Sequence, residues 1–234
     1  MYDFHTHILP GIDDGSKDPQ MSIDMLREEI RGGAQGIALT PHFYADMTDL
    51  QEFFDRRQRS FERLMEAVER TKLEIPPLIL GAEVHYFRGI GRSESLKNLT
   101  LGTSNYLLLE LPFGNWPGNI LEEIENITEI QGLNVVIAHV ERYLDRDKIE
   151  DIIENEDLIK QSNAEFFTDR RASRKALKML KEGKIQILGS DCHNMSYRRP
   201  DLDEAEEIIT KKLGREYIDD INVMSEGIFR EAGA

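Results

Sequence analysis

Short apolar segments recur along this chain, and most of them end in a histidine or a carboxylate. Residues 36–40 are followed by Pro41-His42, residues 78–82 run into Glu83, and residues 104–109 end at Glu110. The segments have the length of strands and are mostly apolar, as expected for strands of a parallel sheet that are buried on both faces. In parallel α/β folds the carboxyl ends of the strands meet on one side of the sheet. We therefore expect the polar side chains to gather at that side.

Helical patterns alternate with these strands, which predicts an α/β fold. We expect seven strands, at residues 2–5, 36–40, 78–82, 104–109, 134–138, 158–163 and 185–189. The expected helices begin at Pro19 and end at Gly32-Gly33, and then cover residues 50–71, 119–130, 146–154, 170–182 and 201–213, before a polar helical tail. Because no linker or internal repeat is visible, we expect residues 1–234 to form a single domain.

Composition excludes several classes of protein. A net charge of −15 argues against a broad cationic surface for nucleic acid, so no nucleic-acid partner is expected. No apolar run approaches the roughly 20 residues that span a bilayer, and the N-terminus has no secretory pattern, so no membrane insertion is expected. The single cysteine, Cys192, rules out an internal disulfide framework and fits a reducing compartment. We expect a cytoplasmic protein.

His5 and His7 stand two residues apart on the first expected strand, and a loop rich in turn residues then delivers Asp13 and Asp14. Residues two apart on a strand face the same side, so the two imidazoles point at one spot, to which either aspartate can return. Alone, this pattern also fits a pair of half-buried strand histidines. The other strand ends supply further side chains of the same kind, namely His42, Glu83, Glu110, His139, Asp191 and His193. The set predicts a joint metal site, and nitrogen and carboxylate ligands without thiolate favour manganese, iron or zinc.

This arrangement resembles the PHP (polymerase and histidinol phosphatase) superfamily of metal-dependent phosphoesterases over essentially the whole chain. Within it, the chain is most similar to the bacterial PHP-type protein-tyrosine phosphatases of capsule and exopolysaccharide operons. The narrower resemblance rests on Asp13-Asp14-Gly15, on Glu110 where many PHP enzymes have histidine, and on the motifs Gly81-Ala82-Glu83, Ala138-His139-Val140-Glu141-Arg142-Tyr143 and Asp191-Cys192-His193-Asn194. It implies a distorted (β/α)7 TIM-like barrel, the PHP fold, with its metal site at the carboxyl ends of the strands.

The resemblance also implies three divalent metal ions, with manganese expected first and iron or zinc as alternatives. The first ion would be held by His5, His7, Glu83 and Asp191, the second by Glu83, Glu110 and His139, and the third by Asp14, His42 and His193. Arg142 and Arg198 match arginines that face the phosphate, although the adjacent Arg199 is an alternative to Arg198. Four carboxylates against three dications leave a surplus of about +2, which suits a phosphomonoester dianion.

The implied activity is that of a protein-tyrosine phosphatase, a phosphoric monoester hydrolase in which a metal-bound hydroxide attacks phosphotyrosine in line. The implied partner is the phosphotyrosine tail of a bacterial tyrosine autokinase that controls polysaccharide export. A PHP phosphoesterase for a small phosphomonoester, such as histidinol phosphate, is the alternative on the same metal centre.

A second chemistry shares the last motif, because Cys192 and Arg198 have the Cys-x5-Arg spacing of cysteine-dependent tyrosine phosphatases. That segment lacks glycine, and strand alternation would turn Cys192 away from the neighbouring ligands, so we disfavour this mechanism. We expect His85 to line the substrate mouth or pack locally, and Trp116 to be a packed loop aromatic. Asp13 is expected beside the metal ligands or in the turn.

Overall fold

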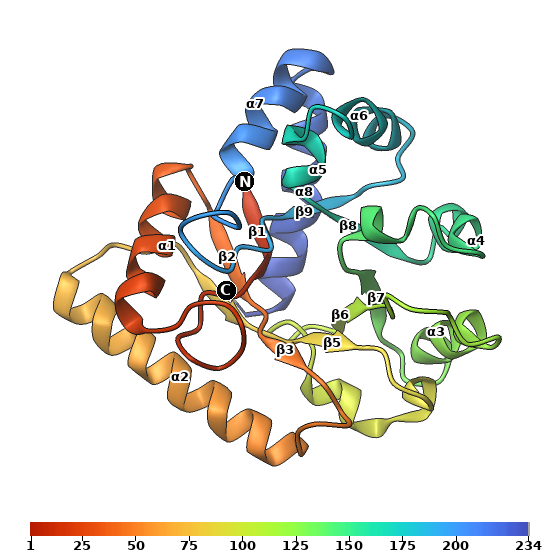
Figure 1. The fold of residues 1–234 in the computed structure, drawn as a ribbon, viewed down its shortest axis with the longest axis horizontal. Helices are drawn as coiled ribbons and strands as arrows, with labels where there is room; N and C mark the ends of the chain where they lie inside the picture. Colours follow the sequence, from red (N-terminus) through yellow and green to blue (C-terminus); the bar gives the residue numbers. More distant parts are fainter. Residues whose placement is uncertain (234) are drawn as a thin grey trace.

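Residues 1–233 are described by a computed structural model, in which a curled sheet of parallel strands is surrounded by helices (Figure 1). The strands are β1 (Tyr2–Thr6), β2 (Gly36–Leu39), β3 (His42–Phe43), β4 (Leu78–Leu80), β5 (Glu83–His85), β6 (Tyr106–Glu110), β7 (Asn134–Ile137), β8 (Ile159–Asn163) and β9 (Ile187–Gly189). The helices are α1 (Pro19–Arg31), α2 (Leu50–Thr71), α3 (Ile120–Glu129), α4 (Ile149–Glu154), α5 (Glu165–Thr168), α6 (Ser173–Lys181), α7 (Leu202–Lys212) and α8 (Arg215–Glu231). Short 3₁₀ turns are η1 (Ile90–Arg92), η2 (Glu94–Asn98) and η3 (Val140–Tyr143).

The sheet follows the order of the chain and closes on itself. Its first part has the order β1-β2-β4 and its second part the order β3-β5-β6-β7-β8-β9, and every printed pairing is parallel. Each of the pairs β2/β3 and β4/β5 occupies one strand position that is interrupted by a break, so seven positions surround the barrel. The seam between β1 and β9 is closed by one parallel bridge, between Thr6 and Cys192. The expected distorted barrel with seven strand positions is confirmed.

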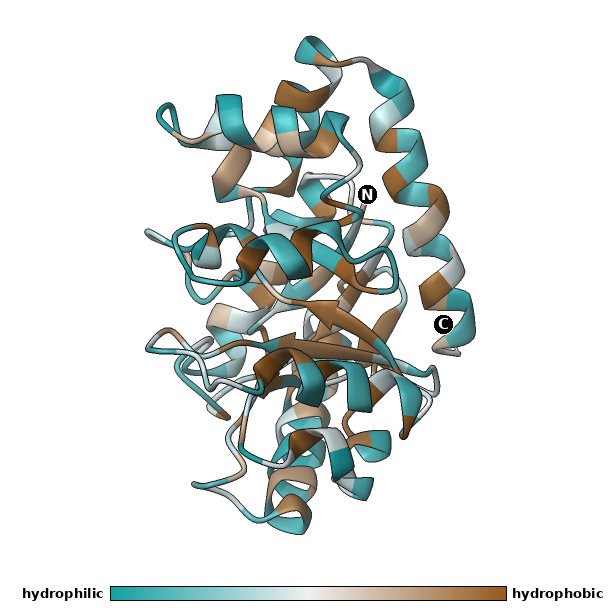
Figure 2. Cartoon of the chain, turned by 90° about the vertical axis from the view of Figure 1, so that its right-hand side faces the viewer, coloured by the Kyte–Doolittle hydropathy of each residue, from teal (hydrophilic) through white to brown (hydrophobic). Residues whose placement is uncertain are grey.

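Two apolar layers hold the barrel together. Inside it, Phe4, Ala38, Leu108 and Val136 form one buried cluster, which Phe229 at the end of α8 closes. Outside it, the opposite faces of the strands pack against the surrounding helices in a larger cluster. Figure 2 shows α8 along one side of the apolar strands, on the side that lies behind the barrel in Figure 1. Because α8 covers that end, the carboxyl ends of the strands remain accessible at the other.

The helices begin where the sequence supplies capping residues. The Asp18 side chain accepts a hydrogen bond from the Met21 amide at the start of α1, and Asp49 accepts from the Gln51 amide at the start of α2. The expected bounds of α2 were correct. Helices α4 and α6 each begin three residues later than expected, and the short α5 was not anticipated, because its four residues are too few for a helical period. No helix within residues 1–233 is long and apolar enough to cross a membrane.

Candidate metal centre

All nine residues expected to hold metal lie together at the carboxyl ends of the strands. We call them the histidine–carboxylate cluster: His5, His7, Asp14, His42, Glu83, Glu110, His139, Asp191 and His193. Within residues 1–233, three overlapping groups of these side chains have ligand atoms close enough to share an ion. The groups are His7, Asp14, His42 and His193, then His5, His7 and Glu83, and finally His42, Glu83 and Glu110.

Strand alternation directs three of these side chains into the barrel. Ala38 and Leu108 point into the interior cluster, and His42 and Glu110 follow them by four and two residues. Glu83 follows the interior residue Ile79 by four in the same way. Because residues an even number apart share one face of a strand, the same period that fills the core also brings these side chains to the centre.

The remaining strand ends depart from regular backbone. The pairing of β1 with β2 shifts register between Asp3 and Thr6, and a shift of this kind lets His5 face the same interior as its neighbour Phe4. His139 and Asp191 have φ angles of 33° and 53°, in the left-handed region that costs energy for residues other than glycine. Such strain persists where surrounding contacts fix it, and it is common at functional sites.

Two glycines permit close approaches to the first two histidines. A Cβ at Gly189 would lie 2.6 Å from the Cβ of His5, and a Cβ at Gly15 would collide with the carbonyl oxygen and Cβ of His7. A side chain at either position would displace an imidazole. The loop after β1 therefore passes directly over His7, which brings both of its aspartates to the cluster.

Four atoms converge on one point with the spacing of metal ligands. Five of the six distances among these atoms lie between 3.1 and 3.6 Å, and the atoms are His5 Nε2, His7 Nε2, Glu83 Oε2 and Asp191 Oδ1. A tetrahedral ion with ligand bonds of about 2.1 Å would place its ligand atoms about 3.4 Å apart. The separations therefore match those around a single small cation.

The hydrogen bonds on the far side of the two imidazoles show why a cation is needed. His7 Nδ1 lies 2.7 Å from Asp13 Oδ2, and His5 Nδ1 lies 3.3 Å from Gln161 Oε1, so each Nδ1 carries the proton in the neutral ring. The His139 amide donates to the same Gln161 oxygen, which fixes that atom as an acceptor. Both Nε2 atoms then present lone pairs to each other and to two carboxylates. A divalent cation satisfies such a set of donors, so these residues fit a metal ion.

Glu83 joins this group to its neighbours. Its Oε1 lies 2.9 Å from His139 Nε2, and its Oε2 lies 2.8 Å from His42 Nδ1. Glu110 Oε1 lies 3.6 Å from the same His139 nitrogen. Although Glu83 Oε2 and His42 Nδ1 are only 2.8 Å apart, neither atom has a partner within residues 1–233 at the angles of a hydrogen bond, as expected of groups arranged for a metal rather than for one another.

The two aspartates of the first loop have different positions. Asp14 Oδ1 lies 3.4 Å from His42 Nε2 and 3.3 Å from His193 Nε2. Asp13 instead accepts a hydrogen bond from His7 Nδ1 at 2.7 Å and another from the His42 amide at 3.1 Å. Asp14 therefore reaches the cluster directly, whereas Asp13 orients an imidazole from behind, as carboxylates beside metal-binding histidines do.

The electrostatics of the cluster come from carboxylates facing imidazoles. Burial would raise the pKa of Glu83 and of Asp191, but the facing imidazoles, led by His5, hold the pKa of both well below the ordinary range. Burial would lower the pKa of His42 and of His139, but the facing carboxylates raise it to about 10 and about 9. The carboxylates are thus held ionised at neutral pH, in the form that binds metal.

Two arginines approach the cluster through Asp191. Arg142 Nη2 lies 2.5 Å from Asp191 Oδ2, and Arg198 Nη2 lies 2.7 Å from Asp191 Oδ1. Both line a cavity of about 180 Å³ beside the cluster. Arg199 also lines this cavity, but its guanidinium pairs with Glu204 and Glu28 and not with Asp191. Of the two neighbouring arginines, the structure brings Arg198 to the cluster.

Sequence reasoning missed two polar residues on β8. Gln161 contacts His5 and the His139 amide, and Asn163 Nδ2 donates to Asp191 Oδ2 at 2.8 Å. They alternate on a strand that is otherwise short of apolar residues, and that alternation was the available signal.

His85, expected to line the mouth or pack locally, lies 2.8 Å from Glu110 Oε2 through its Nδ1 and so contacts the cluster from outside.

The alternative cysteine chemistry is not supported by the position of the thiol. Cys192 is fully buried in the outer apolar cluster, and its Sγ lies 3.9 Å from Glu29 Oε1, on the side facing α1. Burial and the neighbouring carboxylates Glu29 and Asp3 raise the pKa of the thiol well above its usual range. A buried, protonated thiol directed away from the arginines does not serve as the nucleophile.

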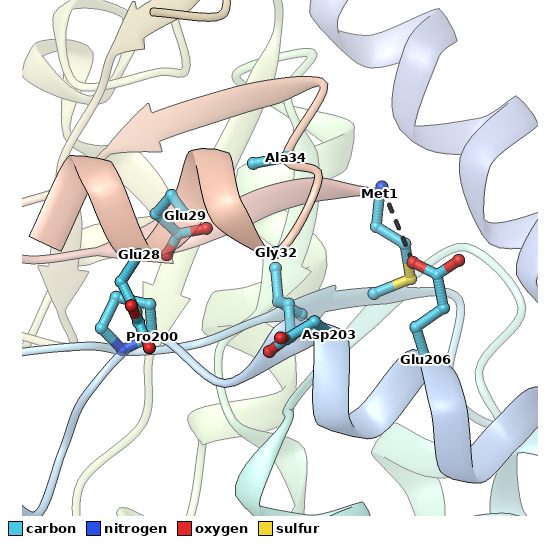
Figure 3. A pocket seen from close by; sticks show the side chains of 9 residues that line it. Met1, Glu28, Glu29, Gly32, Ala34, Pro200, Asp203 and Glu206 are labelled. Atoms are coloured by element: carbon cyan, nitrogen blue, oxygen red, sulfur yellow. Dashed lines mark ion pairs between the residues drawn. The ribbon is translucent and has the colours of Figure 1, made fainter. Parts of the chain in front are cut away.

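A second concentration of acidic residues lies beyond this thiol. Asp3 and Glu29 are both buried and both contact Ser190, and burial, with Asp3 and Asp201 adding to it, raises the pKa of Glu29 well above its ordinary range. We call Asp3, Glu29 and Asp201 the buried acid group. Figure 3 shows the pocket next to it, where the ammonium of Met1 lies 3.9 Å from Glu206 and Glu29 extends from α1. The pocket has no histidine in its lining.

The fold and the histidine–carboxylate cluster define a metal-centred α/β barrel of the PHP type. Residues 1–227 match the family model described as capsular polysaccharide synthesis, CpsB/CapC. The chain belongs to this CpsB/CapC family, which confirms the resemblance seen in the sequence.

Relatives and solved structures agree with this family. The chain is 28% identical over 229 residues to the tyrosine-protein phosphatase CpsB of Streptococcus agalactiae, covering 92% of each chain. It is 28% identical over 231 residues to the tyrosine-protein phosphatase YwqE of Bacillus subtilis, covering 92% of this chain and 86% of that protein. A crystal structure from a study of YwqE from Bacillus subtilis and CpsB from Streptococcus pneumoniae, described as metal-dependent tyrosine phosphatases, matches with a TM-score of 0.84 at 23% identity, covering 99% of this chain and 95% of that one. A phosphotriesterase homology protein from Escherichia coli shares the general fold, with a TM-score of 0.50 at 13% identity over 94% of this chain and 93% of that one.

Proposed function

We propose that this member of the CpsB/CapC family is a metal-dependent protein-tyrosine phosphatase that acts in capsular polysaccharide synthesis. The observation that carries the proposal is the convergence of two imidazole lone pairs with Glu83 and Asp191, next to two arginines that line a cavity. The relatives that match over most of the chain are tyrosine-protein phosphatases. Residues 1–234 act as one catalytic domain.

The cluster holds three divalent ions, which we assign to manganese, with iron or zinc as the alternatives. The first would be held by His5, His7, Glu83 and Asp191, the second by Glu83, Glu110 and His139, and the third by Asp14, His42 and His193. The support is the set of short separations within each group and the position of Glu83 between two of them. Bound ions of this kind supply positive charge for the phosphate and a water molecule whose pKa is lowered towards neutrality.

Arg142 and Arg198 bind the oxygens of the substrate phosphate. Each guanidinium is anchored at one nitrogen by Asp191 and lines the cavity beside it. A guanidinium has five N–H donors, so this contact leaves donors available for two phosphate oxygens. Asp191 therefore fixes the distance between the phosphate-binding groups and the remainder of the cluster.

Other residues of the chain set the orientation of the cluster. Asp13 and Gln161 keep the Nδ1 protons of His7 and His5 in place, so that both Nε2 lone pairs face inwards. His85 fixes Glu110. A tyrosine phenolate has a pKa of about 10 and leaves with less help from a general acid than an alkoxide would require. The site is therefore suited to an aryl phosphate.

The partner we propose is the phosphotyrosine tail of a bacterial tyrosine autokinase, and the compartment is the cytoplasm. The support for the partner is the family's connection with capsular polysaccharide synthesis. The support for the compartment is a single cysteine that is free and buried.

The decisive experiment measures metal content and turnover together. Full-length protein loaded with Mn²⁺ is assayed on a phosphotyrosine peptide, histidinol phosphate and a 3′-recessed oligonucleotide, with and without chelator. We expect turnover of the peptide far above that of the other two substrates, and its loss with chelator. Preferential hydrolysis of histidinol phosphate would overturn the tyrosine-phosphatase assignment. Full activity with fewer than two ions per chain would overturn the model of three ions.

A further inference from the structure

Large apolar side chains are exposed on three loops that leave the end of the barrel where the histidine–carboxylate cluster lies. Among the exposed large apolar residues within 1–233, Met47 follows β3, Phe113 follows β6, and Met195 and Tyr197 follow β9. All three loops leave the carboxyl ends of strands that carry cluster residues. Single exposed apolar residues are common on protein surfaces, so only one that is also held against the cluster points to a ligand.

Phe113 is the most specifically placed of these residues. Its ring stacks on the imidazole of His139, with centroids 5.9 Å apart and planes at 24°. Its other neighbour is Tyr143, at 6.0 Å. The residue is nevertheless 47% exposed. One side of the ring is thus held against a cluster residue while much of its surface remains open to solvent.

The base of the Phe113 loop is firmly held. The buried hydroxyl of Tyr143 accepts a hydrogen bond from the Leu111 amide and donates one to the Leu111 carbonyl, both at 3.0 Å. The indole of Trp116 donates to the Pro112 carbonyl at 2.9 Å. These bonds flank Phe113 on both sides, so its position is set before any ligand arrives. A pre-positioned ring costs less entropy on binding than a mobile one.

Tyr44 lies at another edge of the same group of side chains. Its ring is 5.2 Å from that of His42 and 5.3 Å from that of His85. In the sheet, β3 and β7 lie on either side of β5 and β6, which carry Glu83 and Glu110. Tyr44, which follows β3, and Phe113, which stacks on His139 just after β7, therefore flank these two carboxylates from opposite sides.

We propose that Phe113 is the platform on which the aromatic ring of a phosphotyrosyl side chain stacks, and that Tyr44 is the facing wall. This inference rests on the proposed function and deepens it, because it identifies the residues that select an aryl phosphate over an alkyl phosphate. Aromatic pairs prefer offset stacking, and such pairs contribute beyond the apolar area that they bury. The cluster and the arginines would bind any phosphomonoester, whereas this aromatic slot distinguishes among them.

The test compares the binding of two non-hydrolysable ligands to manganese-loaded, full-length protein by calorimetry. Benzylphosphonate has the aromatic ring and ethylphosphonate lacks it, while both carry the same anionic group. We expect the wild-type protein to bind benzylphosphonate more tightly. Phe113→Leu should lower this preference about fivefold and Tyr44→Leu about threefold, with the affinity for ethylphosphonate changed by less than about twofold.

Two controls keep the interpretation specific. Tyr44→Phe retains the ring and should keep the preference within about twofold. Val223→Ala changes an apolar residue of α8 that is 72% exposed and lies outside the three loops, and it should have no effect. Metal content and Tm of each variant show whether the fold is intact.

The proposal is overturned if both leucine variants retain the preference, or if they weaken the two phosphonates equally. The outcome is separable from that of the proposed function, because binding is measured without turnover. If the preference responds as expected but the wild-type protein does not hydrolyse a phosphotyrosine peptide, the aromatic slot stands and the phosphatase assignment fails. If the wild-type protein hydrolyses the peptide but the preference for benzylphosphonate does not change in the leucine variants, the phosphatase assignment stands and the aromatic slot fails.

Discussion

Two groups of buried carboxylates lie on opposite sides of the turn at residues 190–192. On one side, Glu83 and Asp191 face imidazoles and guanidiniums, which hold their pKa values well below the ordinary range. On the other side, Asp3, Glu29 and Asp201 face mainly one another, and their pKa values are raised. Burial raises the pKa in both groups, so the neighbours decide the direction of the net shift. A concentration of acidic residues therefore does not mark a metal site unless nitrogen ligands converge with it.

The largest expected effect comes from replacing one carboxylate on each side. Glu83→Gln should lower kcat/KM roughly 1000-fold or more and reduce bound metal, because Glu83 touches ligand atoms from four imidazoles. Glu29→Gln should keep metal content and leave activity within about threefold, because Glu29 contacts Ser190 and Cys192 rather than the cluster's ligand atoms, and burial raises the pKa of its carboxyl. Metal analysis alongside kinetics checks both. Equal losses in the two variants would remove the distinction between the groups.

Arg198 and Arg199 allow the same comparison, because Arg198 lies beside the histidine–carboxylate cluster and Arg199 lies beside the buried acid group. Arg198 contacts Asp191, whereas Arg199 pairs with Glu204 and lowers the pKa of Asp201. Arg198→Ala should reduce kcat/KM for a phosphotyrosine peptide about 100-fold, through loss of a charged donor to the phosphate. Arg199→Ala should leave it within about twofold. Steady-state kinetics decides, and a larger loss for Arg199→Ala would reassign the phosphate contact.

The buried acid group should make the fold less stable at alkaline pH. Burial, Asp3 and Glu204 raise the pKa of Asp201 to about 8, with Glu165 adding to the effect and Arg199 opposing it. Between pH 4 and pH 8 the folded state holds a proton that the unfolded state has lost, so the free energy of unfolding falls as the pH rises through this range.

The Asp201→Asn variant isolates that contribution. Its Tm should fall by a few degrees less than that of the wild-type protein between pH 6 and pH 9. Calorimetry of both proteins in chelator gives the difference, since the cluster histidines contribute equally to each. Parallel Tm curves would show that Asp201 is ionised throughout the range.

The smallest expected effect is that of Cys192→Ala, which changes a side chain on the acid side of the turn. Its thiol is buried next to Glu29 and touches no cluster ligand atom, so kcat/KM should change by less than about twofold. Kinetics in Mn²⁺ checks this prediction. Complete loss of activity with metal content retained would revive the cysteine mechanism.

The sequence predicted well which side chains meet in the histidine–carboxylate cluster, because their positions depend on where the strands end and on the alternation of side chains along them. His42, Glu83 and Glu110 follow interior apolar residues at even spacing, so a correct strand assignment also places their side chains. Strand alternation alone does not place the side chains of His139 and Asp191. Their positive φ angles depend on contacts from neighbouring strands, which no local pattern reveals.

Other features depended on distant parts of the chain. Asp13 and Asp14 have the same chemistry, and only the path of the loop over His7 separates their roles. Gln161 was missed because its partners lie on other strands. The breaks between β2 and β3 and between β4 and β5 fall at Thr40-Pro41 and at Gly81-Ala82, where proline and glycine weaken strand pairing, although each segment was expected to form one strand.

The narrow seam between β1 and β9 has a consequence for the whole chain. One bridge at Thr6 and two backbone hydrogen bonds, from His7 to Cys192 and from Asp191 to His5, join the first strand to the last. His5 and Asp191 also meet across this seam at the histidine–carboxylate cluster. An ion shared by these two residues would connect positions 186 residues apart. It would act as a removable cross-link that restricts the unfolded chain much as a long-range disulfide does, in a protein whose single cysteine cannot form one.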